Sequence, residues 1–439
     1  MANKETFCNS AWYEMHVFWD GSLAYCCNQV SPPYSDDVAD KYNVKNMSIS
    51  EWHNSDMMKQ QRLKFNSDVP NPDCFRCWQN EETSDTSRRY KCNMKSAIFQ
   101  RENFEESYEQ SPHNQVFEHS FDNNGDYSGL PVDFHIDLGN HCNLACKMCW
   151  SKASSKIAAQ ELKWGILEDK RLVLSNWTAD DDLWERFATD LLSIPNLKNI
   201  HFMGGETLLS PRLRQLVEDF DKHGRHDVCL SFVTNGTIYD EDLMNKLSKF
   251  NRVGIEISME SVSKQNEYIR QGTDNDLVLS NIKKFATHTN GNNITITLRP
   301  AIGLLSIGYY HTLIEFCLQN QLLIKSSPVT RPTFLANDVL PKSIRQAYKP
   351  LYTQLIEKYD LGEYTNDVDY NESDWHNYKR VALSQINKCI AEIDRPDSAD
   401  QEQLLSEMVK YVKRWDDVYK LDMKDYYPEF SEILDKYGY

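Results

Sequence analysis

The sequence predicts an α/β protein built on a partial, open (β/α)6 barrel. Six short apolar runs of strand length recur between residues 131 and 330, at 133–138, 199–203, 228–233, 253–258, 294–299 and 321–325. Amphipathic stretches separate the runs, and one of them has the i, i+3, i+4, i+7 spacing of a helix at Leu213, Leu216, Val217 and Phe220. Parallel strands need such crossovers, and six units are too few for a complete eight-stranded barrel. The active site of such a sheet is expected at the carboxyl ends of its strands.

The segment before the barrel predicts a small cysteine-rich domain followed by a linker. Residues 1–95 are rich in Trp, Cys and turn residues, with a hairpin signal around Asp20-Gly21. A helix is expected to begin near Ser48 or Ser50 and to continue to Phe65. Residues 96–130 are polar and aperiodic, which predicts a linker or a loop over the surface.

The segment after the barrel, residues 331–439, predicts a helical, acidic and aromatic region. Its clearest signal is an apolar stripe at helical spacing, made by Leu405, Met408, Val412 and Trp415. Such a stripe is typical of a helix face packed in a core.

Composition limits the classes of partner. The chain has 439 residues, 65 acidic against 48 basic side chains and a formal net charge of −17, which disfavours binding to nucleic acid. Mean hydropathy is −0.63, and no apolar run approaches the roughly 18 residues needed to cross a bilayer. The first residues show no basic and apolar signal segment, so we expect a cytoplasmic protein with no membrane partner.

Twelve cysteines are the unusual feature of the composition. Thiols stay reduced in the cytosol, so clustered cysteines indicate a metal site or catalysis rather than disulfides. Seven of them fall into spaced groups, and five do not: Cys27, Cys92, Cys229, Cys317 and Cys389. The last three are expected to be small buried hydrophobic residues.

The most informative segment is FHIDLGNHCNLACKMCW, residues 134–150. Cys142, Cys146 and Cys149 have the spacing CX3CX2C directly after the first strand of the repeat. Three thiolates can hold three irons of a cubane cluster and leave the fourth iron open to another ligand. A zinc site with His141 as the fourth ligand is the alternative.

This spacing, placed after strand one of a partial barrel, resembles the radical S-adenosylmethionine (SAM) superfamily over residues 131–330. The resemblance implies a [4Fe-4S] cluster on Cys142, Cys146 and Cys149 that binds SAM at its open iron. The MGGET segment ends the second strand and resembles the GGE element of the family, which implies that Gly204, Gly205 and Glu206 hold the SAM amino group. Thr207 replaces the common proline after this element.

Further SAM contacts are implied at the next strand ends. Thr234 and Asn235 stand where family members contact the SAM ribose or carboxylate, and Ser258 matches a residue directed toward SAM. Glu260 stands where aspartate is more usual, and Arg270 matches an arginine that reaches the SAM carboxylate. Ordinary surface or salt-bridge roles for Glu256, Ser258 and Arg270 are the alternative. The family's aromatic residue before the third cysteine is Met148 here, which puts its adenine contact in doubt.

The amino-terminal cysteines form a second pattern. Cys26 ends a GX4C segment that starts at Gly21, Cys8 precedes it, and Cys74 and Cys77 form CX2C. The pattern resembles the twitch domain, a shortened relative of the SPASM domain, and implies an auxiliary [4Fe-4S] cluster. A four-thiolate zinc ribbon is the alternative, and the neighbouring Cys27 is an alternative ligand to Cys26. In the best-known members of the family the auxiliary domain follows the barrel, whereas here the cysteine pattern precedes it.

The resemblance implies an enzyme that cleaves SAM reductively and abstracts hydrogen from a small-molecule or peptide substrate. A flavodoxin or ferredoxin is expected as electron donor, and no residue is assigned as catalytic acid or base. Candidate substrate contacts are Arg88, Arg89 and Arg299, with charged-loop or salt-bridge roles as alternatives. The rival hypothesis is a non-catalytic module, stabilised by zinc or an iron–sulfur cluster, that binds a partner or transfers electrons.

Overall fold

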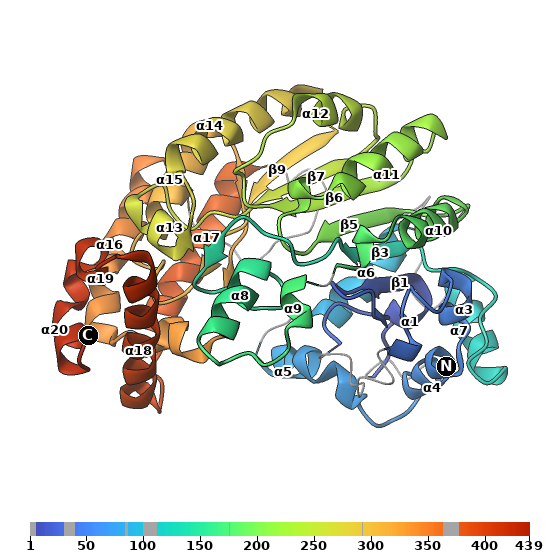
Figure 1. Cartoon of the computed structure of the whole chain (residues 1–439), viewed down its shortest axis with the longest axis horizontal. Helices are drawn as coiled ribbons and strands as arrows, with labels where there is room; N and C mark the ends of the chain where they lie inside the picture. The colour runs from blue at the N-terminus through green and yellow to red at the C-terminus, as the bar shows by residue number, and fades with distance from the viewer. Residues whose placement is uncertain are drawn as a thin grey trace. The chain divides into compact units, whose positions relative to one another are not determined.

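The computed structural model describes residues 6–29, 40–83, 87–99, 112–174, 176–291, 293–362 and 377–439 (Figure 1). The chain divides into two compact units. Unit 1 comprises Met1–His141, Leu162–Phe232 and Lys249–Val253. Unit 2 comprises Cys142–Glu161, Val233–Ser248 and Gly254–Tyr439.

The main sheet has eight strands in the order β11-β9-β7-β6-β5-β3-β1-β2. Their bounds are β1 Glu14–Val17, β2 Leu23–Ala24, β3 Asp133–Asp137, β5 Asn199–Met203, β6 Cys229–Thr234, β7 Val253–Ile257, β9 Ile294–Leu298 and β11 Leu323–Ile324. β1 runs parallel to β3, β3 to β5, β5 to β6 and β9 to β11. All six strands expected from the apolar runs are therefore present, and the pairs named are parallel as predicted.

Alternation of side chains explains why these segments form strands. In β5 and β6 every second residue is buried, including Ile200, Phe202, Leu230 and Phe232, while the residues between them are partly exposed. A period of two places the apolar residues on one face of the sheet, where helices cover them. The other face of these strands is mixed, with the polar Asn199, His201 and Ser231 beside apolar residues such as Met203 and Val233.

The amino-terminal hairpin extends this sheet. β1 and β2 pair antiparallel around Asp20-Gly21, which confirms the predicted hairpin. β1 also pairs in parallel with β3, with Glu14 opposite Asp133 and His16 opposite His135. All four residues of β1 are buried, because the strand is covered on both faces. The predicted boundaries at residues 95, 130 and 330 remain a prediction.

The helices of unit 1 are mostly short. Their bounds are α1 Ser10–Tyr13, α3 Ile49–His53, α4 Asp56–Lys64, α5 Phe75–Thr83, α6 Arg88–Phe99, α7 Pro112–Asp122, α9 Arg171–Leu174, α10 Asp181–Leu192 and α11 Pro211–Lys222, with 3-10 turns η1 Pro72–Cys74, η3 Trp177–Ala179 and η4 Thr207–Leu209. The single helix expected from Ser48 to Phe65 is two helices. Ser48 and Glu51 form a capping box that starts α3, and the Ser55 hydroxyl then accepts a bond from Met58 N–H to start α4.

The expectation of an aperiodic linker over 96–130 is wrong for residues 112–122, which form α7. Phe117 and Phe121 of this helix meet the Trp12 ring edge-on, at centroid distances of 5.0 and 5.6 Å. The polar composition of the segment concealed these few aromatic anchors. Residues 100–111 of the predicted linker lie outside the described residues.

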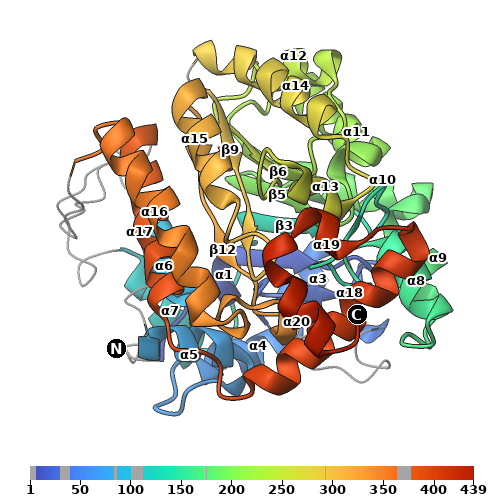
Figure 2. The same ribbon diagram turned by 90° about the vertical axis from the view of Figure 1, so that its left-hand side faces the viewer.

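Unit 2 contains the short strands β4 Ala145–Cys146, β8 Arg270–Gln271, β10 Ala301–Ile302 and β12 Ser327–Pro328. Its helices are α8 Ser155–Lys163, α12 Glu241–Leu247, α13 Lys264–Ile269, α14 Asn275–Ala286, α15 Tyr310–Asn320, α16 Lys342–Lys358, α17 Tyr378–Asp394, α18 Gln401–Tyr419, α19 Met423–Tyr426 and α20 Ser431–Lys436, with 3-10 turns η5 Thr287–Gly291, η6 Thr333–Leu335, η7 Asn337–Val339 and η9 Pro428–Phe430. α16 and α17 lie side by side (Figure 2). The region after residue 331 is therefore helical, and the α18 stripe of Leu405, Met408, Val412 and Trp415 is buried, as predicted.

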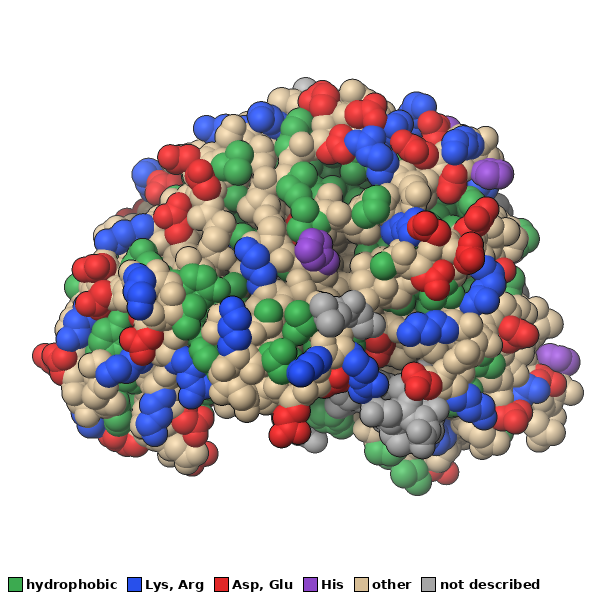
Figure 3. Space-filling model, viewed as in Figure 1, with side chains coloured by type: hydrophobic (Ala, Val, Ile, Leu, Met, Phe, Trp, Pro, Cys, Tyr) green, Lys and Arg blue, Asp and Glu red, His purple; other side chains and the backbone are tan. Residues whose placement is uncertain are grey.

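None of the helices that the structure describes combines the length and apolarity that a bilayer crossing requires. On the face shown in Figure 3, acidic and basic side chains are interspersed.

Arg62 is a buried cation that fixes the core of unit 1. Its guanidinium donates to the carbonyl oxygens of Ala11, Gly125 and His53 at 3.1, 3.1 and 2.7 Å. We predict that Arg62→Met lowers the free energy of unfolding by about 3 kcal/mol or more, because three buried carbonyls lose a charged donor. Urea unfolding measures this effect. The exposed Arg252→Met is the matched control, and an equal loss in both variants would contradict the assignment.

Candidate functional site

The three cysteines of the CX3CX2C motif lie on one loop of unit 2 that is anchored at several points. β4 pairs antiparallel with β8, with Cys146 opposite Arg270. Lys147 N–H donates to Ile269 O at 2.8 Å, and the Ser154 hydroxyl donates to Leu144 O at 3.1 Å. The loop is thus held by backbone pairing on one side and by the residue preceding α8 on the other.

The thiols fit a cluster of the predicted kind. Cys146 is buried, and Cys142 and Cys149 are partly exposed. Burial raises the pKa of Cys149 to about 11 and also raises that of Cys146, with the other two thiols adding to the effect on Cys146. Three thiols on a single loop match the donor set that a cubane with one open iron requires. Binding of the metal would displace their protons.

Arg270 forms a buried ion pair with Glu260 and also contacts the Cys146 thiol. Its Nε and Nη2 donate to the two carboxylate oxygens of Glu260 at 2.5 and 2.7 Å, and its Nη1 donates to Cys146 Sγ at 3.6 Å. Glu260 is fully buried, and one of its oxygens also accepts a bond from Ala301 N–H at 3.1 Å. The structure therefore assigns Glu260 a positioning role, and these contacts use three of the five N–H groups of Arg270.

The end of β6 meets the cysteine loop through polar side chains, and the end of β7 pairs with the end of β6. Asn235 Nδ2 donates to Asn143 Oδ1 at 2.8 Å, and Asn143 Nδ2 donates to the Thr237 hydroxyl at 2.8 Å. Ser258 N–H donates to Thr234 O at 2.8 Å, which places these two predicted residues on neighbouring strand ends. Asn143 and Thr237 were not singled out from the sequence, since a lone Asn or Thr in a loop carries no spacing signal.

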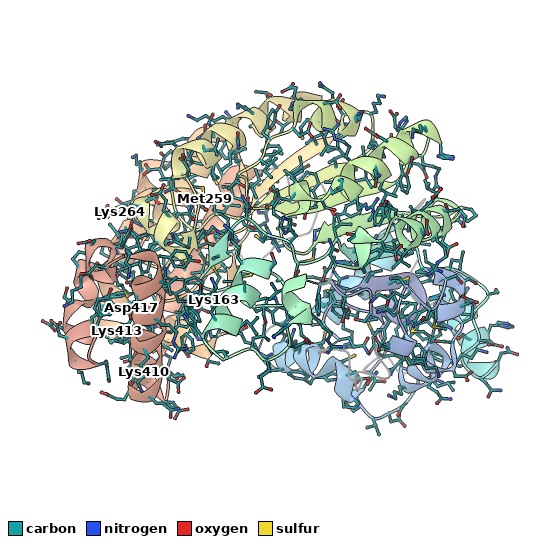
Figure 4. The ribbon with its side chains drawn as sticks, in the orientation of Figure 1. Lys163, Met259, Lys264, Lys410, Lys413 and Asp417 are labelled. Carbon is teal, nitrogen blue, oxygen red and sulfur yellow. The ribbon has the colours of Figure 1, made fainter. Side chains whose placement is uncertain are left out.

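The carboxyl-terminal helices support the same loop. The Tyr411 hydroxyl on α18 donates to Lys147 O at 2.6 Å, and Lys147 Nζ donates to Tyr268 O at 2.7 Å. Burial lowers the pKa of Lys147 to about 8, with Asp416 opposing the shift. Lys264, labelled in Figure 4, joins α13 to Asp425 O of α19. On the exposed face of α18, the same figure labels Lys410, Lys413 and Asp417.

Arg299 is engaged in unit 2 by a neighbouring acid. Its Nε lies 3.0 Å from Glu256 Oε2, and its Nη1 donates to Lys325 O at 3.4 Å. This salt bridge favours the structural alternative for both residues. Neither residue is assigned a role toward SAM or substrate.

The Gly-Gly-Glu turn belongs to unit 1 and follows β5. Gly204 and Gly205 both have positive φ, +86° and +50°, and a Cβ on Gly205 would lie 2.0 Å from His141 O. Glu206 N–H donates to His141 O at 2.8 Å, and the buried Glu206 carboxylate accepts from Leu208 N–H at 3.0 Å. A cavity of about 290 Å³ adjoins Gly204 and Glu206 and is also lined by Leu138, Gly139, His141 and Arg212. Only glycine permits this close approach of two backbones.

The four predicted auxiliary ligands also belong to unit 1, and three of them influence one another. Cys8 raises the pKa of both Cys74 and Cys77, although burial is the larger cause of each shift. Asn28 links the fourth cysteine, Cys26, to Cys77. Its N–H donates to Cys26 Sγ at 3.4 Å, and its Nδ2 lies 4.0 Å from Cys77 Sγ.

Two cysteines that follow no spacing pattern lie beside this group. Cys92 donates to Glu14 Oε1 at 3.1 Å and forms a hydrogen bond with Cys8. Cys27 lies with His16 and His135, and one ligand atom of each is within 4.8 Å of the others. Arg88 donates to both oxygens of Glu14, and Arg89 pairs with Glu81. Both arginines lie in α6, so the charged-loop alternative is wrong for them, and these ion pairs favour a structural role.

The buried Arg270–Glu260 pair yields a test by double-mutant cycle. We predict that Glu260→Gln lowers the free energy of unfolding by about 3–5 kcal/mol, because it leaves the Arg270 charge without its counter-ion. The double variant Glu260→Gln with Arg270→Gln is expected to lose less than the sum of the two single variants, because neither charge is then left alone. Additive losses measured by urea unfolding would contradict the coupling.

Comparison with known proteins identifies the central part of the chain. Residues 136–301 match the family model of the radical SAM superfamily. None of the curated proteins compared matches the chain.

Solved structures with similarity to the chain are distant. Native anSMEcpe with bound AdoMet has a TM-score of 0.38 and 17% identity, covering 52% of this chain and 61% of that chain. SuiB of Streptococcus suis bound to S-adenosylmethionine has a TM-score of 0.35 and 14% identity, covering 62% and 58%. TYW1 with a bound lysine-pyruvate adduct has a TM-score of 0.29 and 15% identity, covering 50% and 72%. This chain spans less than two thirds of the first two structures.

The family match contains all three cysteines of the CX3CX2C loop, the Gly-Gly-Glu turn and the ends of β6 and β7. Residues 136–301 of this chain are therefore a radical SAM superfamily domain.

Proposed function

We propose that this protein is a radical SAM enzyme that acts on a small-molecule or peptide substrate. The observation that carries the proposal is the single loop that holds Cys142, Cys146 and Cys149, anchored by the pairing of β4 with β8 and lying within the residues that match the family. A [4Fe-4S] cluster held by these three thiolates would supply the one electron needed to cleave SAM into methionine and a 5′-deoxyadenosyl radical, the species that would abstract hydrogen from the substrate.

In this proposal, the chain's own residues prepare the thiolates for the cluster. The Arg270 N–H directed at Cys146 Sγ stabilises negative charge on that sulfur. Hydrogen bonds to sulfur and burial are the protein's means of setting the potential of such a cluster. The Glu260 carboxylate keeps the guanidinium in place and reduces the net charge beside the metal.

The SAM contacts remain proposals that rest on the resemblance. We assign the SAM amino group to Gly204, Gly205 and Glu206, whose turn provides an acidic side chain and closely packed backbone. Thr234, Asn235 and Ser258 are assigned to the ribose or carboxylate of SAM. The carboxylate would also receive the N–H groups of Arg270 that Glu260 and Cys146 do not use.

We propose an auxiliary [4Fe-4S] cluster on Cys8, Cys26, Cys74 and Cys77. The contacts of Asn28 with Cys26 and Cys77 support Cys26 as ligand instead of Cys27. Thiolates on different irons of a cubane lie farther apart than ligands that share one ion. The four thiols therefore need not lie within the 4.8 Å that ligands of a single ion would require. Such a cluster would assist substrate oxidation or binding, with a cytoplasmic flavodoxin or ferredoxin as electron donor.

The proposed reaction is tested by SAM cleavage in the cluster-loaded protein. After anaerobic reconstitution and dithionite reduction, the wild-type chain is expected to release 5′-deoxyadenosine from SAM. Cys146→Ala removes a ligand and is expected to abolish release, whereas Cys317→Ala, which removes a buried thiol outside both motifs, is expected to retain it. Intact SAM with the reduced, cluster-loaded wild type would contradict the enzyme proposal and favour a binding or electron-transfer module.

The auxiliary cluster is tested by iron and sulfide content. We expect about eight irons per chain in the wild type, and about four in Cys74→Ala or Cys26→Ala. Cys27→Ala is the matched variant and is expected to keep about eight irons. Equal iron content in the Cys26 and wild-type proteins would contradict the ligand assignment.

A further inference from the structure

A row of histidines crosses one face of the sheet in unit 1. His16 on β1 is in register with His135 on β3, and His135 is in register with His201 on β5. The His16 and His135 rings are stacked, with centroids 5.9 Å apart and an interplanar angle of 17°. Both side chains are buried, at 4% and 9% exposure, so the row is not an ordinary solvated polar face.

Cys27 completes a compact set of donors at one end of this row. One ring nitrogen from each of His16 and His135, together with Cys27 Sγ, lie within 4.8 Å of one another. Among the residues that the structure describes, this is the one set in which three or more potential metal ligands lie within that distance of one another. Donors this close are suited to a single ion.

Some ring nitrogens of His16 and His135 have no hydrogen-bond partner among the described residues. Among described residues, His16 Nδ1 and His135 Nδ1 have no hydrogen-bond partner, and His16 Nε2 is in an ion pair with Asp137 Oδ1 at 3.6 Å, beyond hydrogen-bond distance. Buried polar atoms are nearly always hydrogen-bonded, and leaving one without a partner costs about 1–3 kcal/mol. Two such nitrogens, one on each of two adjoining buried rings, indicate a ligand that the described protein groups do not supply.

The charges around the set suit a divalent cation. Asp137 Oδ1 lies 3.6 Å from His16 Nε2, where a carboxylate can orient a ligating imidazole. A Cys27 thiolate and the Asp137 carboxylate together neutralise two positive charges. Arg88 donates to His135 Nε2 at 3.1 Å, but it also donates to both oxygens of Glu14 at 3.0 and 2.9 Å. Glu14 can therefore hold the guanidinium when a metal occupies the imidazole.

We propose that His16, Cys27 and His135 form a mononuclear transition-metal site, of the zinc class, whose ligands differ from those of both proposed iron–sulfur clusters. Two imidazoles and one thiolate select a borderline-soft ion such as Zn²⁺ over Mg²⁺ or Ca²⁺. Three protein ligands leave a fourth position for water or another ligand, as in catalytic zinc sites. The adjacent cysteines then have different roles, with Cys26 serving the auxiliary cluster and Cys27 the zinc.

Zinc-edge X-ray absorption tests the site in the cluster-loaded protein, because its signal is separate from that of iron. One equivalent of Zn²⁺ is added anaerobically after reconstitution and desalting. We expect one zinc per chain with a single sulfur at about 2.3 Å and two or three nitrogen or oxygen ligands at about 2.0–2.1 Å. Four-sulfur coordination, no sulfur, or no retained zinc in the wild type would overturn the proposal.

Variants identify the ligands. Cys27→Ser and His16→Gln are each expected to weaken zinc affinity by about 100-fold or more, measured by competition with a chromogenic chelator. Cys317→Ser is the matched control and is expected to retain wild-type affinity. Circular dichroism and iron content verify that each variant is folded and loaded. Wild-type zinc affinity in a folded Cys27→Ser protein would overturn the assignment, independently of whether the enzyme cleaves SAM.

Discussion

The buried ion pair between Arg270 and Glu260 is the interaction on which the cysteine loop depends. Glu260 is fully buried, and its two oxygens hold the guanidinium at 2.5 and 2.7 Å. Arg270 in turn pairs with Cys146 across β4 and β8 and donates to its sulfur. Burying two charges costs free energy that the pair alone does not always recover. A fold that places such a pair beside the Cys146 thiol therefore gains a fixed orientation and a positive charge at that sulfur more than it gains stability.

Elements distant in sequence converge on this loop within unit 2. Asn143 is held by Asn235 and Thr237 after β6, while Tyr411 of α18 bonds to Lys147 O. The helical region after residue 331 thus supports the cysteine loop as well as forming its own core. Each contact restricts a loop that must present three thiolates at fixed positions, which lowers the conformational cost of binding a cluster.

Local patterns made much of the fold predictable. The six strands follow from short apolar runs, the hairpin from Asp20-Gly21, and the α18 core stripe from the helical spacing through Trp415. Features that depend on tertiary pairing were missed. The parallel pairing of β1 with β3 joins residues more than a hundred positions apart, and α7 is anchored by Phe117 and Phe121 within a polar segment. No local period encodes either contact.

In the candidate site, too, some residues carry a local sequence pattern and others are recognised only from their tertiary contacts. The cysteine spacings indicated both sets of thiols, but the partners that position them carry no motif. Glu260 was read only as a departure from the usual aspartate, yet it holds Arg270. Cys27 was considered only as a substitute for Cys26, whereas its proximity to His16 and His135 arises from strand register.

The central claim is that the Cys142–Cys149 loop holds a cluster with one iron open to SAM. Electron paramagnetic resonance of the dithionite-reduced Cys74→Ala protein, before and after addition of SAM, tests it most directly, because that variant is designed to leave this cluster alone. The account predicts a reduced [4Fe-4S] signal whose g values shift when SAM binds. A signal unchanged by saturating SAM would contradict it.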